Sequence, residues 1–220
     1  MRIGIPILVL IMTIVVAASC SRPPHVAGGS GQPSSVVQEV HANAADAADL
    51  SDPNSFADAR RGFVAAPEGH ISDLQGKVIR DFDAFGFLQG EAPATVHPSL
   101  WRQALLNNHV GLFKVSERIW QVRGFDLANM TLIEGDSGFI VIDALTARET
   151  ATAALAFARQ HLGDRPVTAL VYTHSHADHF GGALGILSPE DVQARQLPVV
   201  APAGFLEEAT SENVLMGTAM

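Results

Sequence analysis

Cysteine and basic residues are both scarce in this sequence, and each shortage disfavours a class of protein. Cys20 is the only cysteine among 220 residues, so the chain cannot form an internal disulfide and must rely on core packing or bound metal. There are 14 Lys and Arg against 23 Asp and Glu, a formal net charge of −9. Because nucleic acid binding relies on clustered cations, and these are scattered, the composition argues against nucleic acid as a partner.

Long apolar runs are few, and the clearest one stands at the start of the chain. Arg2 precedes an apolar run from Ile3 to Ala18, which Ser19 and Cys20 follow. The run is shorter than the roughly 20 residues that cross a bilayer, and its basic start and small-residue ending predict a signal peptide over residues 1–19. An uncleaved anchor is the lesser alternative.

The end of the predicted signal peptide resembles a bacterial lipobox, in which Cys20 would carry lipid and tether the protein to the membrane. Ala17 stands where Leu is usual, so cleavage to a plain secreted protein stays open. Either way, we expect an exported protein that is periplasmic or lipid-anchored in the bacterial cell envelope.

The composition changes after the predicted signal. Residues 20–50 are rich in Ser, Gly, Pro, Ala and Asp, with too few large side chains to offset the entropy of ordering them. We therefore expect a disordered tether there. Residues 51–220 approach the size of one small domain and are expected to hold the folded part.

Short apolar runs and turn residues predict an α/β fold. We expect a helix over Asp52–Ala66, an extended segment over Val78–Phe87 and a helical turn over Trp101–Asn107. Six strands are expected, at Gly111–Val115, Ile119–Val122, Met130–Glu134, Phe139–Ile142, Val167–Tyr172 and Pro198–Ala201. The residues Gly135 to Gly138 suit a tight hairpin.

A helix is expected between the fourth and fifth of these strands. Thr146 and Glu149 form a capping-box pattern at its start, and Gly163 with Pro166 ends it. An apolar stripe runs along it through Ala151, Ala154, Leu155, Ala158 and Leu162. Strand, helix and strand then make a right-handed crossover, which places the residues after Tyr172 at the carboxyl end of a parallel strand, where α/β sheets build sites.

Those residues are the densest set of metal-ligand side chains in the sequence: His174, His176, Asp178 and His179. Imidazole and carboxylate are ligands of zinc and also serve iron or manganese. Because side chains two apart on an extended chain share a side, His174 and His176 can hold one ion together, while Asp178 and His179 can face a second. A polar loop whose histidines cap or are solvated is the alternative.

This motif is that of the metallo-beta-lactamase superfamily, and the chain resembles its zinc-dependent alkyl sulfatases from about Asp52 onward. The segments that carry the resemblance are Pro98–Gln103, Leu106–Asn108, Gly111–Val115, Ile119–Gly124, Asn129–Thr131 and Thr173–Gly182. It implies the αββα fold of that superfamily, of which this chain would be the N-terminal half. It also implies hydrolysis of alkyl sulfate esters, a small-molecule substrate and a homodimer.

The same resemblance implies two Zn2+ ions, the first on His174 and His176 and the second on Asp178 and His179. Asp178 would also orient the attacking water as the catalytic residue. No histidine follows His179 in the chain, whereas such enzymes take further ligands downstream, so we expect a truncated chain. The alternatives left open are a beta-lactamase or thioesterase on the same scaffold and a non-catalytic lipoprotein remnant.

Residues outside the motif receive weaker assignments. Asp143, which ends a predicted strand, is expected to brace the histidine loop as superfamily aspartates do, or else to form a turn. Asn107, Asn108, Arg123 and Asn129 reach a substrate or satisfy backbone groups, and the pattern does not decide between the two.

Overall fold

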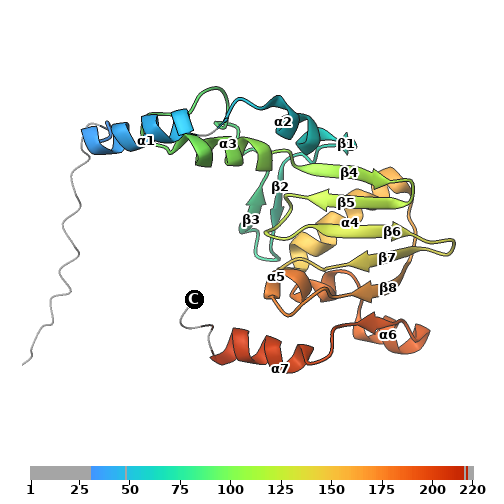
Figure 1. Cartoon of the computed structure of the whole chain (residues 1–220). Coiled ribbons are helices and arrows are strands. Elements are labelled where there is room, and N and C mark those ends of the chain that lie inside the picture. The colour runs from blue at the N-terminus through green and yellow to red at the C-terminus, as the bar shows by residue number, and fades with distance from the viewer. Residues whose placement is uncertain (1–30, 48, 216, 218–220) are drawn as a thin grey trace, which may run out of the picture.

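The computed structural model describes residues 31–47, 49–215 and 217, shown in Figure 1. The predicted signal peptide and Cys20 lie outside the described residues. Within the described part of the chain, no helix combines the length and apolarity that a membrane crossing requires.

A seven-stranded sheet forms the centre of the fold, with the strand order β1-β4-β5-β6-β7-β8-β9. Pairing is antiparallel from β1 to β7 and parallel from β7 to β9. The strands are β1 Phe63–Ala65, β4 Gly111–Ser116, β5 Ile119–Arg123, β6 Met130–Glu134, β7 Phe139–Ile142, β8 Val167–Val171 and β9 Val199–Val200. The six expected strands are thus confirmed, each within two residues of its expected bounds.

Helices and a small hairpin surround this sheet (Figure 1). The hairpin consists of β2 His70–Ser72 and β3 Val78–Asp81. The helices are α1 Ser35–Ala47, α2 Pro53–Arg60, α3 Pro98–Asn107, α4 Arg148–Leu162, α5 Ala177–Phe180, α6 Pro189–Arg195 and α7 Phe205–Thr210, with a 3-10 turn at Ala183–Gly185 and a π-helical turn at Ser211–Leu215. The predicted mixed α/β class is confirmed.

One face of the sheet makes the core by packing against α4. On β6 and β7 the buried side chains alternate with half-exposed ones, so Leu132, Phe139 and Val141 point to the same side. The facing stripe of α4 is small, with Ala154 and Ala158 fully buried, and this lets the helix lie close to the strands. Burying each large side chain contributes roughly 1.5–3 kcal/mol.

The start of α4 differs from the expected capping box. The N-cap residue is Ala147, which offers no side-chain cap. The hydroxyl of Thr146 instead donates to Asp126, in a neighbouring loop, at 2.7 Å. A tertiary hydrogen bond has here replaced the local one that the sequence pattern predicts.

The N-terminal part holds more structure than expected. Helix α1 occupies much of the segment expected as a tether, and it packs on α3. His41 Nδ1 also lies 3.1 Å from the carbonyl oxygen of Ala94, in the loop before α3. The helix expected over Asp52–Ala66 ends at Arg60, and the chain turns at Gly62, whose φ of 73° is a left-handed value, to enter β1. Edge pairing with β4 therefore outweighs the local helical preference.

The predicted crossover is confirmed. β7 and β8 are parallel neighbours, with Ile142 paired to Val171, and α4 connects them. The carboxyl ends of both strands consequently meet at one edge of the sheet, where Asp143 follows β7 and Thr173 follows β8 closely. Helix α5 lies at this same edge (Figure 1).

Candidate metal centre

Two loops are joined at the carboxyl edge of β7 and β8: residues 143–147 and residues 173–182. The amide of Ala144 donates to the His179 carbonyl at 2.7 Å, and the amide of Gly182 donates to the Leu145 carbonyl at 2.8 Å. Asp143 and Leu145 both have φ of 63°, a strained value for leucine. The bonds between the loops hold this backbone in place and fix the position of the histidine loop.

Asp143 is the side chain that joins the two loops. It is buried and accepts hydrogen bonds from the Thr173 amide at 2.9 Å and the Thr173 hydroxyl at 2.8 Å. Its second oxygen also lies 2.8 Å from His179 Nδ1. The expected bracing of the histidine loop by Asp143 is therefore what the structure shows, and the turn-former alternative does not describe these contacts.

The three imidazoles of the motif lie together. The ring centroids of His174 and His179 are 4.0 Å apart, and those of His174 and His176 are 4.6 Å apart. Asp178 and His179 lie on the short helix α5, and Asp178 Oδ2 is 3.4 Å from His179 Nε2. The structure thus brings all four predicted ligands into one cluster.

Each imidazole uses one ring nitrogen in a hydrogen bond. His174 Nδ1 is 2.9 Å from the Thr173 hydroxyl, and His179 Nδ1 meets Asp143. His176 Nε2 lies 2.9 Å from a carboxylate oxygen of Glu212. Metal-bound histidines commonly donate one N–H to such a partner and bind the ion through the other nitrogen.

These donors fit a metal ion by their chemistry, while the cluster does not form a closed coordination sphere. Among the residues that the structure describes, no group of three or more His, Cys, Asp or Glu side chains is arranged to surround one ion. The four side chains are therefore candidate ligands that need a small rearrangement or further donors to complete a site.

Glycines let the two loops approach each other. A Cβ on Gly182 would collide with the carbonyl oxygen of Ala144, and one on Gly181 would collide with that of Thr146. After them, Ala183–Gly185 forms a single 3-10 turn. The tight packing at the glycines places this turn directly against α4, where the Thr152 hydroxyl donates to the Gly185 carbonyl at 3.2 Å.

Sequence reasoning missed two contributors to this edge. Glu212, in the π-helical turn after α7, reaches His176 because the end of the described chain folds back toward the loop. No local pattern around Glu212 signals this contact. Asp126, in the loop between β5 and β6, accepts hydrogen bonds from the Thr146 and Ala147 amides at 3.1 and 3.3 Å. Its position just before a strand that begins at this edge of the sheet is the sequence signal that could have identified it.

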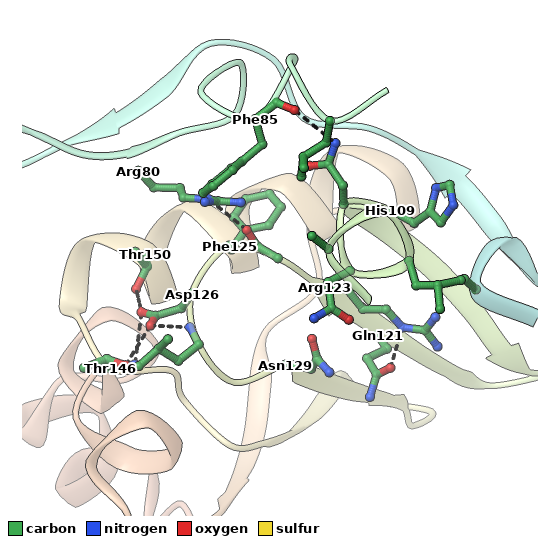
Figure 2. A pocket seen from close by; sticks show the side chains of 18 of the residues that line it. Arg80, Phe85, His109, Gln121, Arg123, Phe125, Asp126, Asn129, Thr146 and Thr150 are labelled. Atoms are coloured by element: carbon green, nitrogen blue, oxygen red, sulfur yellow. Dashed lines mark hydrogen bonds between the residues drawn. The ribbon is translucent and has the colours of Figure 1, made fainter. Parts of the chain in front are cut away.

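The four residues whose role the sequence did not decide lie together, outside the histidine cluster. Asn107, Asn108, Arg123 and Asn129 all line one cavity of about 1010 Å³, which Figure 2 shows from close by. Thr146 also lines it, so its wall reaches the loop that supports the histidine cluster.

Comparisons with known proteins agree with this geometry. Residues 123–214 match the family described as the metallo-beta-lactamase superfamily. The chain is 52% identical over 172 residues to an (R)-specific secondary-alkylsulfatase of Pseudomonas sp., covering 78% of this chain and 26% of that protein. It is 48% identical over 174 residues to a linear primary-alkylsulfatase of Pseudomonas sp., again covering 78% of this chain and 26% of that protein.

The fold matches as well. The solved structure of a stereoselective inverting sec-alkylsulfatase from Pseudomonas sp. superposes with a TM-score of 0.81 at 49% identity, covering 86% of this chain and 30% of that one. The chain thus spans about a quarter of the length of the relatives that it matches.

Proposed function

Since this chain carries part of a metallo-beta-lactamase superfamily domain and is a close relative of alkylsulfatases over most of its length, we propose that its chemistry is the metal-dependent hydrolysis of alkyl sulfate esters. In that reaction water cleaves the ester, and an alcohol and hydrogen sulfate are released. The observation that carries the proposal is the similarity of sequence and fold to alkylsulfatases across the histidine loop itself.

The metal we propose is zinc, as a pair of ions, with His174 and His176 serving one and Asp178 and His179 the other. Such ions supply a Lewis acid and lower the pKa of water toward neutrality. Further donors from outside the cluster would complete the coordination, because the described side chains do not close around an ion.

The chain's own residues would prepare this site. Asp143 accepts from His179 Nδ1, which fixes the tautomer that leaves Nε2 as the binding atom. In the same way Glu212 accepts from His176 Nε2 and leaves Nδ1. Asp178 would orient the attacking water, as the role of this position in the motif implies.

The test is sulfate release from dodecyl sulfate by the purified protein, with and without a chelator. We expect release that the chelator abolishes and added zinc restores. Asp178→Asn should lower the rate by at least about 100-fold, the scale of a misplaced reacting group, while Asp164→Asn, at an exposed position, should not. Turnover of a β-lactam or a thioester without sulfate release would replace this proposal by another hydrolase of the superfamily.

We also infer that the protein is exported, from the basic start and the apolar run Ile3–Ala18. Mass spectrometry of the mature N-terminus checks this. A lipid-modified Cys20 would establish anchoring to the envelope, and cleavage without lipid would establish a secreted form.

A further inference from the structure

The cavity in Figure 2 lies at the same edge of the sheet as the candidate metal centre. Arg123 ends β5 and Asn129 precedes β6, just as Asp143 follows β7. Three strand spacings separate β5 from β8, which is about 14 Å, so a ligand in the cavity would not occupy the histidine cluster. Its volume of about 1010 Å³ is at the upper end of the range typical of small-molecule sites.

The cavity carries uncompensated positive charge in a chain whose net charge is −9. Arg123 Nε donates to the Gln121 side chain at 2.6 Å, and Arg80 Nε donates to the Gly124 carbonyl at 3.0 Å. Among the described residues, neither guanidinium lies within ion-pair distance of a carboxylate. Both therefore keep terminal N–H groups for a ligand.

The carboxylate of Asp126 does not neutralise these cations. It is the one acidic side chain among the described lining residues, and it points toward Thr146 and Thr150, as Figure 2 shows. There it accepts from the hydroxyls of Thr146 and Thr150 and from backbone amides. Its acceptor capacity is thus used within the protein.

The guanidiniums are held in place by aromatic rings. Arg123 lies over Phe113 at 4.2 Å from the ring centroid, and Arg80 lies over Phe85 at 5.2 Å. Burial lowers the pKa of the Arg123 guanidinium, which shows a cation partly withdrawn from water while still charged at neutral pH. Cations ordered in this way lose little entropy when they bind an anion.

The remaining walls are apolar or carry amides. Ile79, Phe85, Leu88 and Leu127 contribute hydrophobic surface, and Leu127 is 86% exposed, which a ligand would cover favourably. Asn107, Asn108 and Asn129 add amide groups to the lining, of which the Asn108 amide donates to the Phe85 carbonyl at 3.5 Å. The cavity therefore joins an anion-binding end to a hydrophobic wall.

From this combination we propose that the cavity is a second binding site, which takes a single-chain anionic amphiphile with a sulfate, sulfonate or carboxylate head on Arg123 and its alkyl chain along the apolar wall. This site is separate from the proposed metal centre and does not depend on the hydrolytic activity. It would hold an amphiphile next to the histidine loop, since Thr146 lines the cavity and abuts Gly181.

The experiment is calorimetric titration of the full chain with decyl sulfonate below its micellar concentration, in the presence of a chelator. We expect one saturable site. Decyltrimethylammonium, which has the same chain and the opposite charge, should not bind, and inorganic sulfate should bind more weakly. Decanoate distinguishes a site selective for sulfur oxyanions from one that accepts carboxylates, and saturable binding of either anion supports the proposal.

Variants locate the site. Arg123→Gln should weaken decyl sulfonate binding by about 10-fold or more, the scale of a lost charge-assisted hydrogen bond. Arg80→Gln removes a charge from another side of the cavity, as Figure 2 shows, and should weaken binding less. The matched control is Arg118→Gln, which removes the same charge from the hairpin end of the sheet, where Arg118 pairs with the exposed Asp136; it should leave the affinity unchanged.

Several outcomes would overturn the proposal: equal weakening by Arg118→Gln and Arg123→Gln, binding that the chelator abolishes, or equal binding of the cationic amphiphile. If Arg123→Gln lowers the melting temperature because its stacking on Phe113 is lost, Leu127→Ser tests the proposal instead. Leu127→Ser alters an exposed side chain and should weaken decyl sulfonate without affecting inorganic sulfate. Because these titrations need neither metal nor turnover, a failed sulfatase assay leaves their result intact.

Discussion

At the scale of single residues, one carboxylate organises the candidate metal centre. Asp143 receives two bonds from Thr173 and one from His179, so it sets both the path of the histidine loop and the tautomer of a candidate ligand. Its positive φ suits aspartate and asparagine better than most side chains.

We predict that Asp143→Asn keeps the fold and weakens metal binding. Asparagine tolerates the same backbone and fills the same space, but its neutral amide pairs poorly with His179 Nδ1. Zinc affinity, measured by competition with a chelating dye, should fall by about 10- to 100-fold, the usual effect of losing such a partner. Asp136→Asn, at an exposed hairpin position, is the control; similar losses in both variants would contradict the bracing role.

Asp126 gives a second prediction, on pH. Burial opposes its ionisation, but hydrogen bonds from Thr150, Thr146 and the Leu127 and Ala147 amides outweigh that effect and hold the pKa of Asp126 below the ordinary value. A carboxyl whose pKa is lower in the folded state contributes stability above its unfolded pKa of about 3.9, and this stability is lost as the pH falls through the folded pKa.

Removing one donor should reduce that pH dependence. Thr150→Val preserves shape and deletes the hydroxyl, so we expect the free energy of unfolding at pH 7 to fall by about 1–3 kcal/mol. The difference between pH 7 and pH 3, measured by urea unfolding, should shrink as well. Thr152→Val changes an exposed hydroxyl on the same helix and should not change how the free energy of unfolding depends on pH. If Thr150→Val also leaves this pH dependence unchanged, these hydrogen bonds do not set the pKa of Asp126.

At the scale of elements, the histidine loop depends on the close approach of two loops that glycine allows. Gly182→Ala would drive a Cβ into the carbonyl oxygens of Ala144 and Ala147. We expect a loss of about 1–3 kcal/mol in the free energy of unfolding, as overpacking usually causes, with amide shifts at Ala144 and His179 in NMR spectra. Gly86→Ala, at a looser turn, should change neither, and comparable effects at both positions would argue against the proposed close approach.

Elements whose pattern is local were predictable, and those set by distant contacts were not. Strands β4 to β8 and the crossover follow from alternation and turn residues, and the spacing of His174, His176, Asp178 and His179 identified their cluster. β1 escaped prediction because its pairing with β4 outweighs a helical sequence. Helix α1 was not predicted because its contacts with α3 are tertiary. The contact of Glu212 was not predicted because its partner His176 is distant in the sequence.

At the scale of the whole molecule, one core supports both the metal centre and the cavity. Phe139 is fully buried between the sheet and α4, so Phe139→Ala should cost about 3–5 kcal/mol and loosen both sites together. Denaturant unfolding measures the loss, and Phe87→Ala, at a largely exposed ring, should have little effect. A small cost at Phe139 would mean that the core is not shared as described.

The order of strands in the sheet also has a kinetic consequence. β4 to β7 are consecutive hairpins whose contacts close over short stretches of chain, whereas β1 meets β4 only after the long segment that contains β2, β3 and α3. Closing such a loop is entropically slow. The meander should therefore nucleate folding and the β1 edge should join last, an order that pulsed hydrogen exchange would reveal as late protection of the Lys114 amide, which donates to Gly62 at 2.7 Å.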